Sequence, residues 1–175
     1  MKQGKNMLEL FAGTHSVGEV MKENGYNVVS LDITDYGGKH VPTHKCDILT
    51  WDYKQYDKDF FDVVWASPPC IFYSKLQDCW IGRMKKSGLY TVERHEEDLA
   101  LANSWVLKAI EIIEYFNPKY WFIENPDNGK LKNMEFMQFL PYHTIDYCMY
   151  SDWGYRKRTR IWTNLVGFDP RICKR

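Results

Sequence analysis

The stretch ASPPCIFYS, residues 66–74, places a cysteine after two prolines and close behind an apolar run. Pro68 and Pro69 fix the backbone torsion and remove two amide donors, so Cys70 is presented in a defined direction at the end of a strand. A thiolate held in this way is a candidate nucleophile for an electron-poor ring. The alternative is a thiol buried as a small apolar group, which is the commoner role of a single cysteine.

A second candidate group is Glu124, in the segment FIENP at the end of the next predicted strand. A carboxylic acid at that place could meet the same substrate and donate or share a proton. A cysteine and a glutamate at neighbouring strand ends occur together by chance far less often than either alone. The pair therefore indicates covalent catalysis rather than packing.

A third group of residues fits a cofactor. In FAGTHSVG, residues 11–18, Gly13 and Gly18 permit close backbone approach, and the following helix start offers free amides. Asp32 ends the next strand about nineteen residues beyond Gly13, where an acid can accept hydrogen bonds from ribose hydroxyls. Asp47 follows a third strand and could reach an adenine amino group. Each feature alone is more often a plain turn or cap, and the spacing is not G-x-G-x-x-G, but together they indicate an adenosine-type cofactor.

These residues need a scaffold that brings strand ends together. Apolar runs predict strands at residues 6–11, 27–32, 44–49, 60–66 and 119–125. Helical spacing predicts a helix from Val17 that stops at Gly25 and a long crossover helix over residues 96–116, on Leu99, Ala102, Val106, Ala109, Ile110 and Ile113. This alternation predicts an α/β fold with a mostly parallel sheet.

The last part of the chain changes character. A short helix is expected over residues 134–140, and strands over residues 143–150 and 160–165. Only about ten residues, with Gly154 among them, join these two strands, a length that suits an antiparallel hairpin rather than a crossover.

Length and composition bound the class of protein. With 175 residues, 45% of them hydrophobic, we expect a single domain over residues 1–175. No apolar run reaches membrane-spanning length and the start lacks a cleavable leader pattern, so a soluble intracellular protein is expected. The five cysteines show no metal-ligand spacing, which predicts reduced thiols and no metal site.

The formal net charge is zero, which gives no global attraction to nucleic acid. Cations do gather late in the chain, in RKRTR at residues 156–160. A phosphate-binding patch and a solvated charged end are equally good interpretations of that cluster.

The segments LELFAGTHSVG, SPPC, IENP and RKRTRIW, in this order and at these intervals, resemble the cytosine-5 DNA methyltransferases. The resemblance extends over residues 7–164. It implies a Rossmann-like, S-adenosylmethionine-dependent methyltransferase fold. It also implies transfer of a methyl group to ring carbon 5 of cytosine in DNA.

The resemblance implies a role for each matched residue. Cys70 would add to ring carbon 6, Glu124 would hydrogen-bond the ring nitrogen and amino group, and Arg158 and Arg160 would lie beside the base and the nucleophile. Asp32 would meet the ribose, and Asp47 with Ile48 the adenine. The implied cofactor-binding residues are Phe11, Ala12, Gly13, Thr14, Gly18, Asp32, Ile33, Asp47, Ile48 and Pro68.

The chain departs from the family pattern in three places. His15 stands where a second glycine is usual, and Arg156 where a glutamine is common. The family continues beyond the RIWTNLVGF stretch into a target-recognition region and a closing helix. We therefore expect a second copy of the chain or a partner subunit to supply target recognition, within a bacterial or viral host cell.

Two alternatives stay open. One is a catalytically idle module that binds cofactor or nucleic acid for a partner chain, although a binding role needs no nucleophile. The other keeps the chemistry and changes the substrate to a free nucleotide, RNA or a single strand, since an unpaired base avoids the cost of base flipping. The polar residues 71–94 are expected to form a lid over Cys70. Four aromatic residues there are candidates to stack on a base: Phe72, Tyr73, Trp80 and Tyr90.

Overall fold

The computed structural model describes residues 4–152 and 154–174. A seven-stranded sheet has the order β3-β2-β1-β4-β7-β9-β8. In chain order its strands are β1 (Lys5–Leu10), β2 (Tyr26–Asp32), β3 (His44–Lys45), β4 (Val63–Ala66), β7 (Tyr120–Pro126), β8 (Tyr142–Asp146) and β9 (Arg158–Thr163). The first five strands pair in parallel, and β9 lies antiparallel between β7 and β8. The predicted α/β fold and its hairpin are confirmed.

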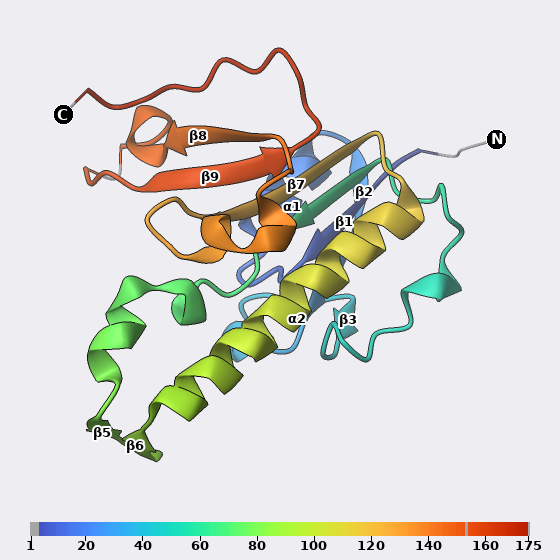
Figure 1. The fold of residues 1–175 in the computed structure, drawn as a ribbon. Coiled ribbons are helices and arrows are strands. Elements are labelled where there is room, and N and C mark those ends of the chain that lie inside the picture. The colour runs from blue at the N-terminus through green and yellow to red at the C-terminus, as the bar shows by residue number, and fades with distance from the viewer. Residues whose placement is uncertain (1–3, 153, 175) are drawn as a thin grey trace.

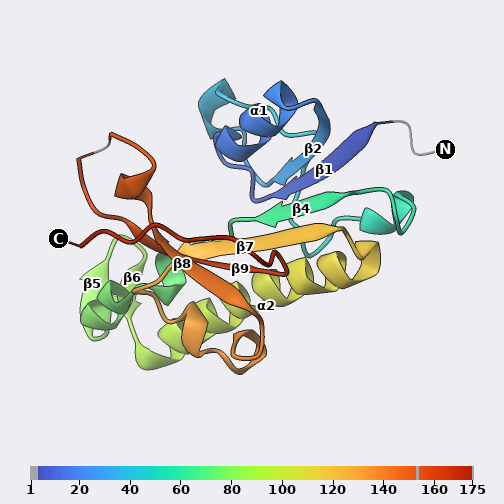
Figure 2. The ribbon, with the colours of Figure 1, turned by 90° about the horizontal axis from the view of Figure 1, so that it is seen from above.

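Two α-helices cover opposite faces of the sheet (Figures 1 and 2). Helix α1 (Ser16–Glu23) packs against β1 and β2. Helix α2 (Val92–Phe116) crosses the other face and contributes its apolar stripe to the core: Ala102, Val106, Ala109, Ile112, Ile113 and Phe116. The Thr91 side chain accepts a hydrogen bond from the amide of Arg94 and so caps α2. The first helical residue, Val92, lies four residues before the predicted start. Asn117, at φ 42°, ends the helix as predicted.

The strand predicted over residues 44–49 is wrong in length, because only His44–Lys45 is extended. The Asp47 carboxylate accepts the amide of Leu49 at 2.9 Å, and the Asp47 carbonyl accepts the amide of Thr50 at 3.1 Å. This local turn competes with the sheet ladder and ends the strand.

The short helix predicted over residues 134–140 is also wrong as one element. The chain forms two 3₁₀ turns, Leu131–Asn133 and Glu135–Met137. Met134 between them has an extended backbone with ψ 136°, which interrupts the helical run.

Residues 71–94, the segment expected to form a lid over Cys70, contain regular secondary structure. They form 3₁₀ helices Ile71–Tyr73 and Lys75–Trp80, a hairpin of β5 (Arg83–Lys85) and β6 (Gly88–Tyr90), and the start of α2. Figure 1 shows this hairpin at the N-terminal end of α2.

Hydrogen bonds tie this segment to the body of the protein. The Tyr90 hydroxyl donates to Asp98 at 2.7 Å, and Asp78 forms ion pairs with His95 and Lys130. Tyr90 is 1% exposed and Tyr73 is fully buried, so stacking of either ring on a base is excluded. Trp80 is exposed.

Candidate active site

The parallel strands end at one level, which collects the residues that follow them. Leu10 of β1 pairs with Leu31 of β2 and with Ala66 of β4, and Ala66 pairs with Ile123 of β7. The next residues along the four strands are Phe11, Asp32, Ser67 and Glu124. This edge is where open α/β sheets bind their ligands.

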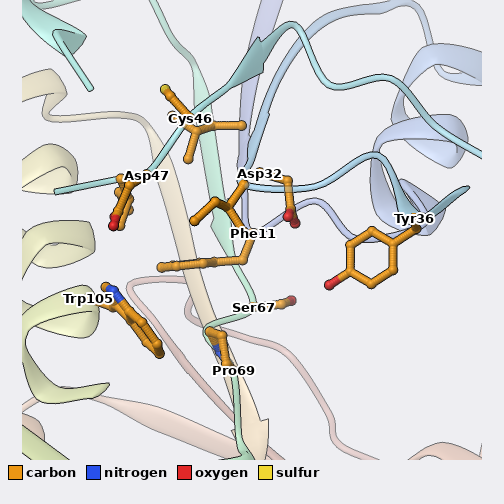
Figure 3. A pocket seen from close by; sticks show the side chains of 11 residues that line it. Phe11, Asp32, Tyr36, Cys46, Asp47, Ser67, Pro69 and Trp105 are labelled. Atoms are coloured by element: carbon orange, nitrogen blue, oxygen red, sulfur yellow. The ribbon is translucent and has the colours of Figure 1, made fainter. Parts of the chain in front are cut away.

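A pocket of about 210 Å³ opens at this edge (Figure 3). Aromatic rings and two carboxylates surround it, and Phe11, Tyr36 and Trp105 come from three separate elements of the chain. The lining residues are Phe11, Leu31, Asp32, Ile33, Tyr36, Cys46, Asp47, Ile48, Ser67, Pro69 and Trp105.

Asp32 holds the turn that follows β1. Its Oδ2 accepts the amide of Gly13 at 2.9 Å and its Oδ1 accepts the amide of Thr34 at 3.0 Å. Phe11 and Gly13 have φ values of 57° and 56°, in the left-handed region, where glycine is favoured and phenylalanine is strained. The carboxylate of Asp32 therefore stabilises an unusual backbone that points the Phe11 ring into the pocket.

The ten predicted cofactor residues divide into two sets. Five line the pocket: Phe11, Asp32, Ile33, Asp47 and Ile48. The other five, Ala12, Gly13, Thr14, Gly18 and Pro68, are not among the lining residues. Ala12 donates its amide to the carbonyl of Leu31, which lines the pocket, and the Pro68 carbonyl accepts from the side chain of Asn125, so Ala12 and Pro68 support the walls.

Sequence reasoning missed Tyr36 and Trp105. Trp105 precedes Val106 on α2, and a helix-spacing argument assigns such an aromatic residue to the core. Its neighbour in space is Phe72, with ring centroids 5.9 Å apart. Tyr36 follows β2 in a loop with no periodic signal, although its φ of 48° marks a special backbone position.

The chemistry of this pocket fits an adenosine moiety. Flat apolar and aromatic surfaces suit a purine ring, and Asp32 and Asp47 offer carboxylate acceptors for hydroxyl and amino donors. Asp32 is 6% exposed, so few competing water contacts are available to it.

Cys70 lines a second pocket, of about 360 Å³, beside the first. Pro69 lines the first pocket and Cys70 the second, so consecutive residues of one loop face the two spaces. The Cys70 side chain is exposed, and its carbonyl accepts the amide of Tyr73 at 3.1 Å, which starts a 3₁₀ turn. The second pocket is lined by Cys70, Ser74, Lys75, Leu76, Asn125, Pro126, Asn128 and Gly129.

Glu124 of β7 is not among the residues that line this pocket, whereas Asn125 and Pro126, which follow it, are. The following residue, Asn125, donates its side-chain amide to the Pro68 carbonyl at 3.0 Å, which ties the Cys70 loop to the strand that carries Glu124. Within the described chain, the buried Oε1 of Glu124 has no hydrogen-bond partner, and Lys157 Nζ lies 3.7 Å away. Burial raises the pKa of the Glu124 carboxyl above its ordinary value, and Lys157 opposes the rise.

Arg158 and Arg160, the expected arginine pair, lie on β9 and make intramolecular ion pairs. Arg158 holds Asp146 through two hydrogen bonds, of 3.1 and 3.0 Å. Arg160 donates to Asp127 at 2.9 Å and lies 3.9 Å from the centroid of the Tyr142 ring. Lys157, between β8 and β9, contacts Glu124 instead.

Across residues 4–152 and 154–174, no group of three or more histidine, cysteine or acidic side chains is arranged to hold a metal ion. Within the same ranges, no helix combines the length and apolar character needed to cross a bilayer.

Comparison with solved structures defines the class of fold. The chain superposes on the Entamoeba histolytica methyltransferase EhMeth with a TM-score of 0.61 and 18% identity, covering 98% of this chain and 56% of that one. A Spodoptera frugiperda DNMT2 mutant gives a TM-score of 0.54 and 17% identity, covering 95% and 53%. The chain thus has a Rossmann-like methyltransferase fold and spans about half the length of these structures.

Comparison with curated proteins defines the family. A probable DNA (cytosine-5)-methyltransferase of Frog virus 3 (isolate Goorha) is 44% identical over 170 residues, covering 95% of this chain and 74% of the relative. No family model matches the chain. At this identity and coverage the chain belongs to the cytosine-5 DNA methyltransferase family, as the sequence resemblance predicted.

Proposed function

We propose that this protein transfers a methyl group from S-adenosylmethionine to ring carbon 5 of cytosine in DNA, through a covalent adduct with Cys70. The main support for this proposal is the loop in which Pro69 lines the first pocket, which suits a nucleoside, and Cys70 lines the second pocket. Such a loop sets a thiol and a methyl donor on either side of one ring. Family membership supports the reaction class.

In this mechanism the Cys70 thiolate forms a bond to ring carbon 6, and the displaced electron pair makes carbon 5 nucleophilic. S-adenosylmethionine, when bound, supplies the electrophilic methyl group. Loss of the carbon 5 proton and departure of the Cys70 thiolate then restore the ring double bond. Covalent attachment thereby activates a carbon that is unreactive in free cytosine.

Glu124 stabilises the adduct in this proposal. Its carboxyl has a raised pKa, and Oε1 has no hydrogen-bond partner among the described residues, so a proton carried there can be donated to the ring nitrogen as negative charge builds on it. Lys157, 3.7 Å away, adds positive charge on the same side.

Trapping with a fluorinated substrate tests the nucleophile. An oligonucleotide carrying cytosine with fluorine at ring carbon 5 is expected to stay linked to the protein, because fluorine blocks the elimination that releases Cys70. Cys70→Ser should give no adduct, since a serine hydroxyl has almost no anionic form at neutral pH. Cys79→Ser is the matched control and should trap normally, because Cys79 is exposed in the segment after the loop. Denaturing electrophoresis and peptide mass spectrometry give the readout, and an adduct at Cys79, or one formed by Cys70→Ser, would refute the assignment.

A further inference from the structure

A buried acid and a buried histidine lie directly beneath the turn that shapes the cofactor pocket. Glu9 of β1 is 2% exposed and His15, just before α1, is 1% exposed. The Oε2 atom of Glu9 contacts Nδ1 of His15, and the Oε1 atom accepts the amide of Gly18 at 3.0 Å. His15 has a φ of 64°, which turns its side chain inward.

The pair explains why residue 18 is glycine. A Cβ atom at Gly18 would lie 2.0 Å from Cε1 of His15 and 2.5 Å from Oε2 of Glu9. Helix α1 therefore starts directly over the acid and the imidazole, and only a glycine fits there. His15 itself stands where the family pattern has a glycine, so its side chain occupies space that the usual residue leaves open.

The same cluster reaches the opposite wall of the pocket. The rings of His15 and His40 stack with centroids 3.9 Å apart and planes 2° from parallel. His40 Nε2 lies 3.0 Å from the Ser30 hydroxyl, which in turn accepts the amide of Thr43 at 3.1 Å. The loop that these contacts hold, residues 33–43, carries two of the pocket residues, Ile33 and Tyr36.

The proton between Glu9 Oε2 and His15 Nδ1 belongs to the acid. Burial raises the pKa of Glu9 to about 7, and burial together with His40 lowers the pKa of His15 to about 4. The other charged groups that bear on the pair are Glu19 and Lys22 of α1 and, through His40, Asp32. Neutral His15 that accepts at Nδ1 carries its own proton on Nε2, 3.6 Å from Glu19 Oε1.

We propose that Glu9 and His15 are a positioning pair, in which the protonated Glu9 carboxyl donates to Nδ1 of neutral His15 and so fixes both the turn 11–18 and the loop 33–43 around the cofactor pocket. The inference rests on the proposed cofactor. It assigns a role to His15, which stands where the family pattern has a glycine.

The pair makes cofactor binding depend on pH. As the pH rises through the Glu9 pKa of about 7, the carboxyl becomes a buried anion, which burial disfavours, and the bond to His15 persists only if the imidazole moves its proton from Nε2 to Nδ1. The favourable state is therefore present below this pKa and lost above it. We expect the affinity for S-adenosylhomocysteine, the demethylated cofactor, to fall at most about ten-fold for each pH unit above the pKa.

Calorimetry with S-adenosylhomocysteine at pH 6 and pH 8.5 tests the pair. Glu9→Gln keeps a donor toward Nδ1 without a titratable proton, so its affinity should match the unmutated protein at pH 6 and stay constant at pH 8.5. His15→Ala should bind about ten-fold more weakly at pH 6, because it leaves a buried polar group without a partner. Glu23→Gln, on an exposed residue of α1, is the matched control and should reproduce the unmutated pH profile. Equal pH profiles for Glu9→Gln and the unmutated protein would overturn the proposal.

A second measurement separates this inference from the proposed function. Nitrogen NMR of the imidazole in the unmutated protein should show His15 with Nε2 protonated and Nδ1 unprotonated at pH 6, whether or not cofactor is present. Protection of the Gly18 amide against hydrogen exchange should change above pH 7 more in the unmutated protein than in Glu9→Gln, because ionisation of Glu9 alters the acceptor Oε1. If no cofactor binds at any pH, the proposed function fails, and these two readouts still decide the pair. A doubly protonated His15 at pH 6, or identical exchange in both proteins, counts against it.

Discussion

The carboxyl groups of Glu9, Glu124 and Asp146 hold their protons differently because their neighbours differ. Glu9 faces an uncharged imidazole and Glu124 a single lysine at 3.7 Å, so burial dominates and raises the pKa of both. Asp146 accepts hydrogen bonds from two guanidinium groups, which hold its pKa well below the ordinary value despite burial. Burial thus shifts Glu9 and Glu124 toward the protonated form, which suits donors, whereas the two arginines keep Asp146 ionised at neutral pH.

At the residue scale, Glu124→Gln tests the acid. The amide keeps hydrogen bonding but cannot supply a proton, so substrate affinity should persist while turnover falls by about 10²–10⁴-fold, the usual scale of general acid–base help. Steady-state methyl transfer to an oligonucleotide gives both quantities. Glu114→Gln, on an exposed position of α2, should leave turnover unchanged. Unaltered turnover in Glu124→Gln would remove this carboxyl from the mechanism.

At the element scale, Asp146 joins three segments of the C-terminal region. It ends β8, accepts the two hydrogen bonds of Arg158 on β9, and accepts the amide of Cys173 at 2.8 Å. Its own amide donates to the Arg171 carbonyl at 3.1 Å, which lays the last residues alongside the strand. Figure 2 shows this terminal segment running along the β8–β9 side of the sheet.

Asp146→Asn should therefore loosen the hairpin and its covering segment together. We expect the free energy of unfolding to fall by about 2 kcal/mol at pH 7, since an ionic acceptor is lost beside arginines that are partly exposed. Urea unfolding measures the change, with the exposed Asp152→Asn as control.

The pH dependence of this effect has a definite sign. The pKa of Asp146 is lower in the folded state than its ordinary value of 3.8, so its stabilising contribution is complete above pH 3.8 and disappears as the pH falls below it. The difference between the unmutated protein and Asp146→Asn should shrink toward pH 3. A difference that grows on acidification would contradict the ion-pair account.

At the scale of the whole molecule, the formal charge is zero, with 23 basic and 23 acidic residues. Three cations near the Cys70 pocket are engaged within the protein, since Lys130 pairs with Asp78, and Lys132 and Arg160 pair with Asp127. Lys75, which lines the pocket, is exposed. We therefore expect few phosphate contacts and a shallow salt dependence, with a slope of log K against log salt no steeper than roughly −3 on duplex DNA. Fluorescence anisotropy over a salt series measures it. A slope of about −6 or steeper would show that a larger cationic surface takes part.

One sheet carries both pockets. The single domain over residues 1–175 stays a prediction. A second copy or partner chain that supplies target recognition stays a prediction. Light scattering of the protein with and without an oligonucleotide addresses it, and a monomer that methylates long duplex DNA unaided would contradict it.

The sequence by itself determined the parallel scaffold and the level at which its strands end. Apolar runs followed by Phe11, Asp32, Cys70 and Glu124 were enough, because the carboxyl ends of adjacent parallel strands must meet at one edge. Local turn chemistry, in contrast, overrode the apolar pattern after Lys45, where Asp47 closes a turn.

Only the tertiary structure decided which side chains enter the pockets and which are buried beneath them. Tyr36 and Trp105 line the first pocket from a loop and from α2, while Tyr73 and Tyr90 are buried. His15 forms its pair with Glu9 across a chain reversal. These outcomes depend on contacts between segments distant in sequence, and a one-dimensional pattern of residue types does not encode which partner each buried polar or aromatic side chain meets.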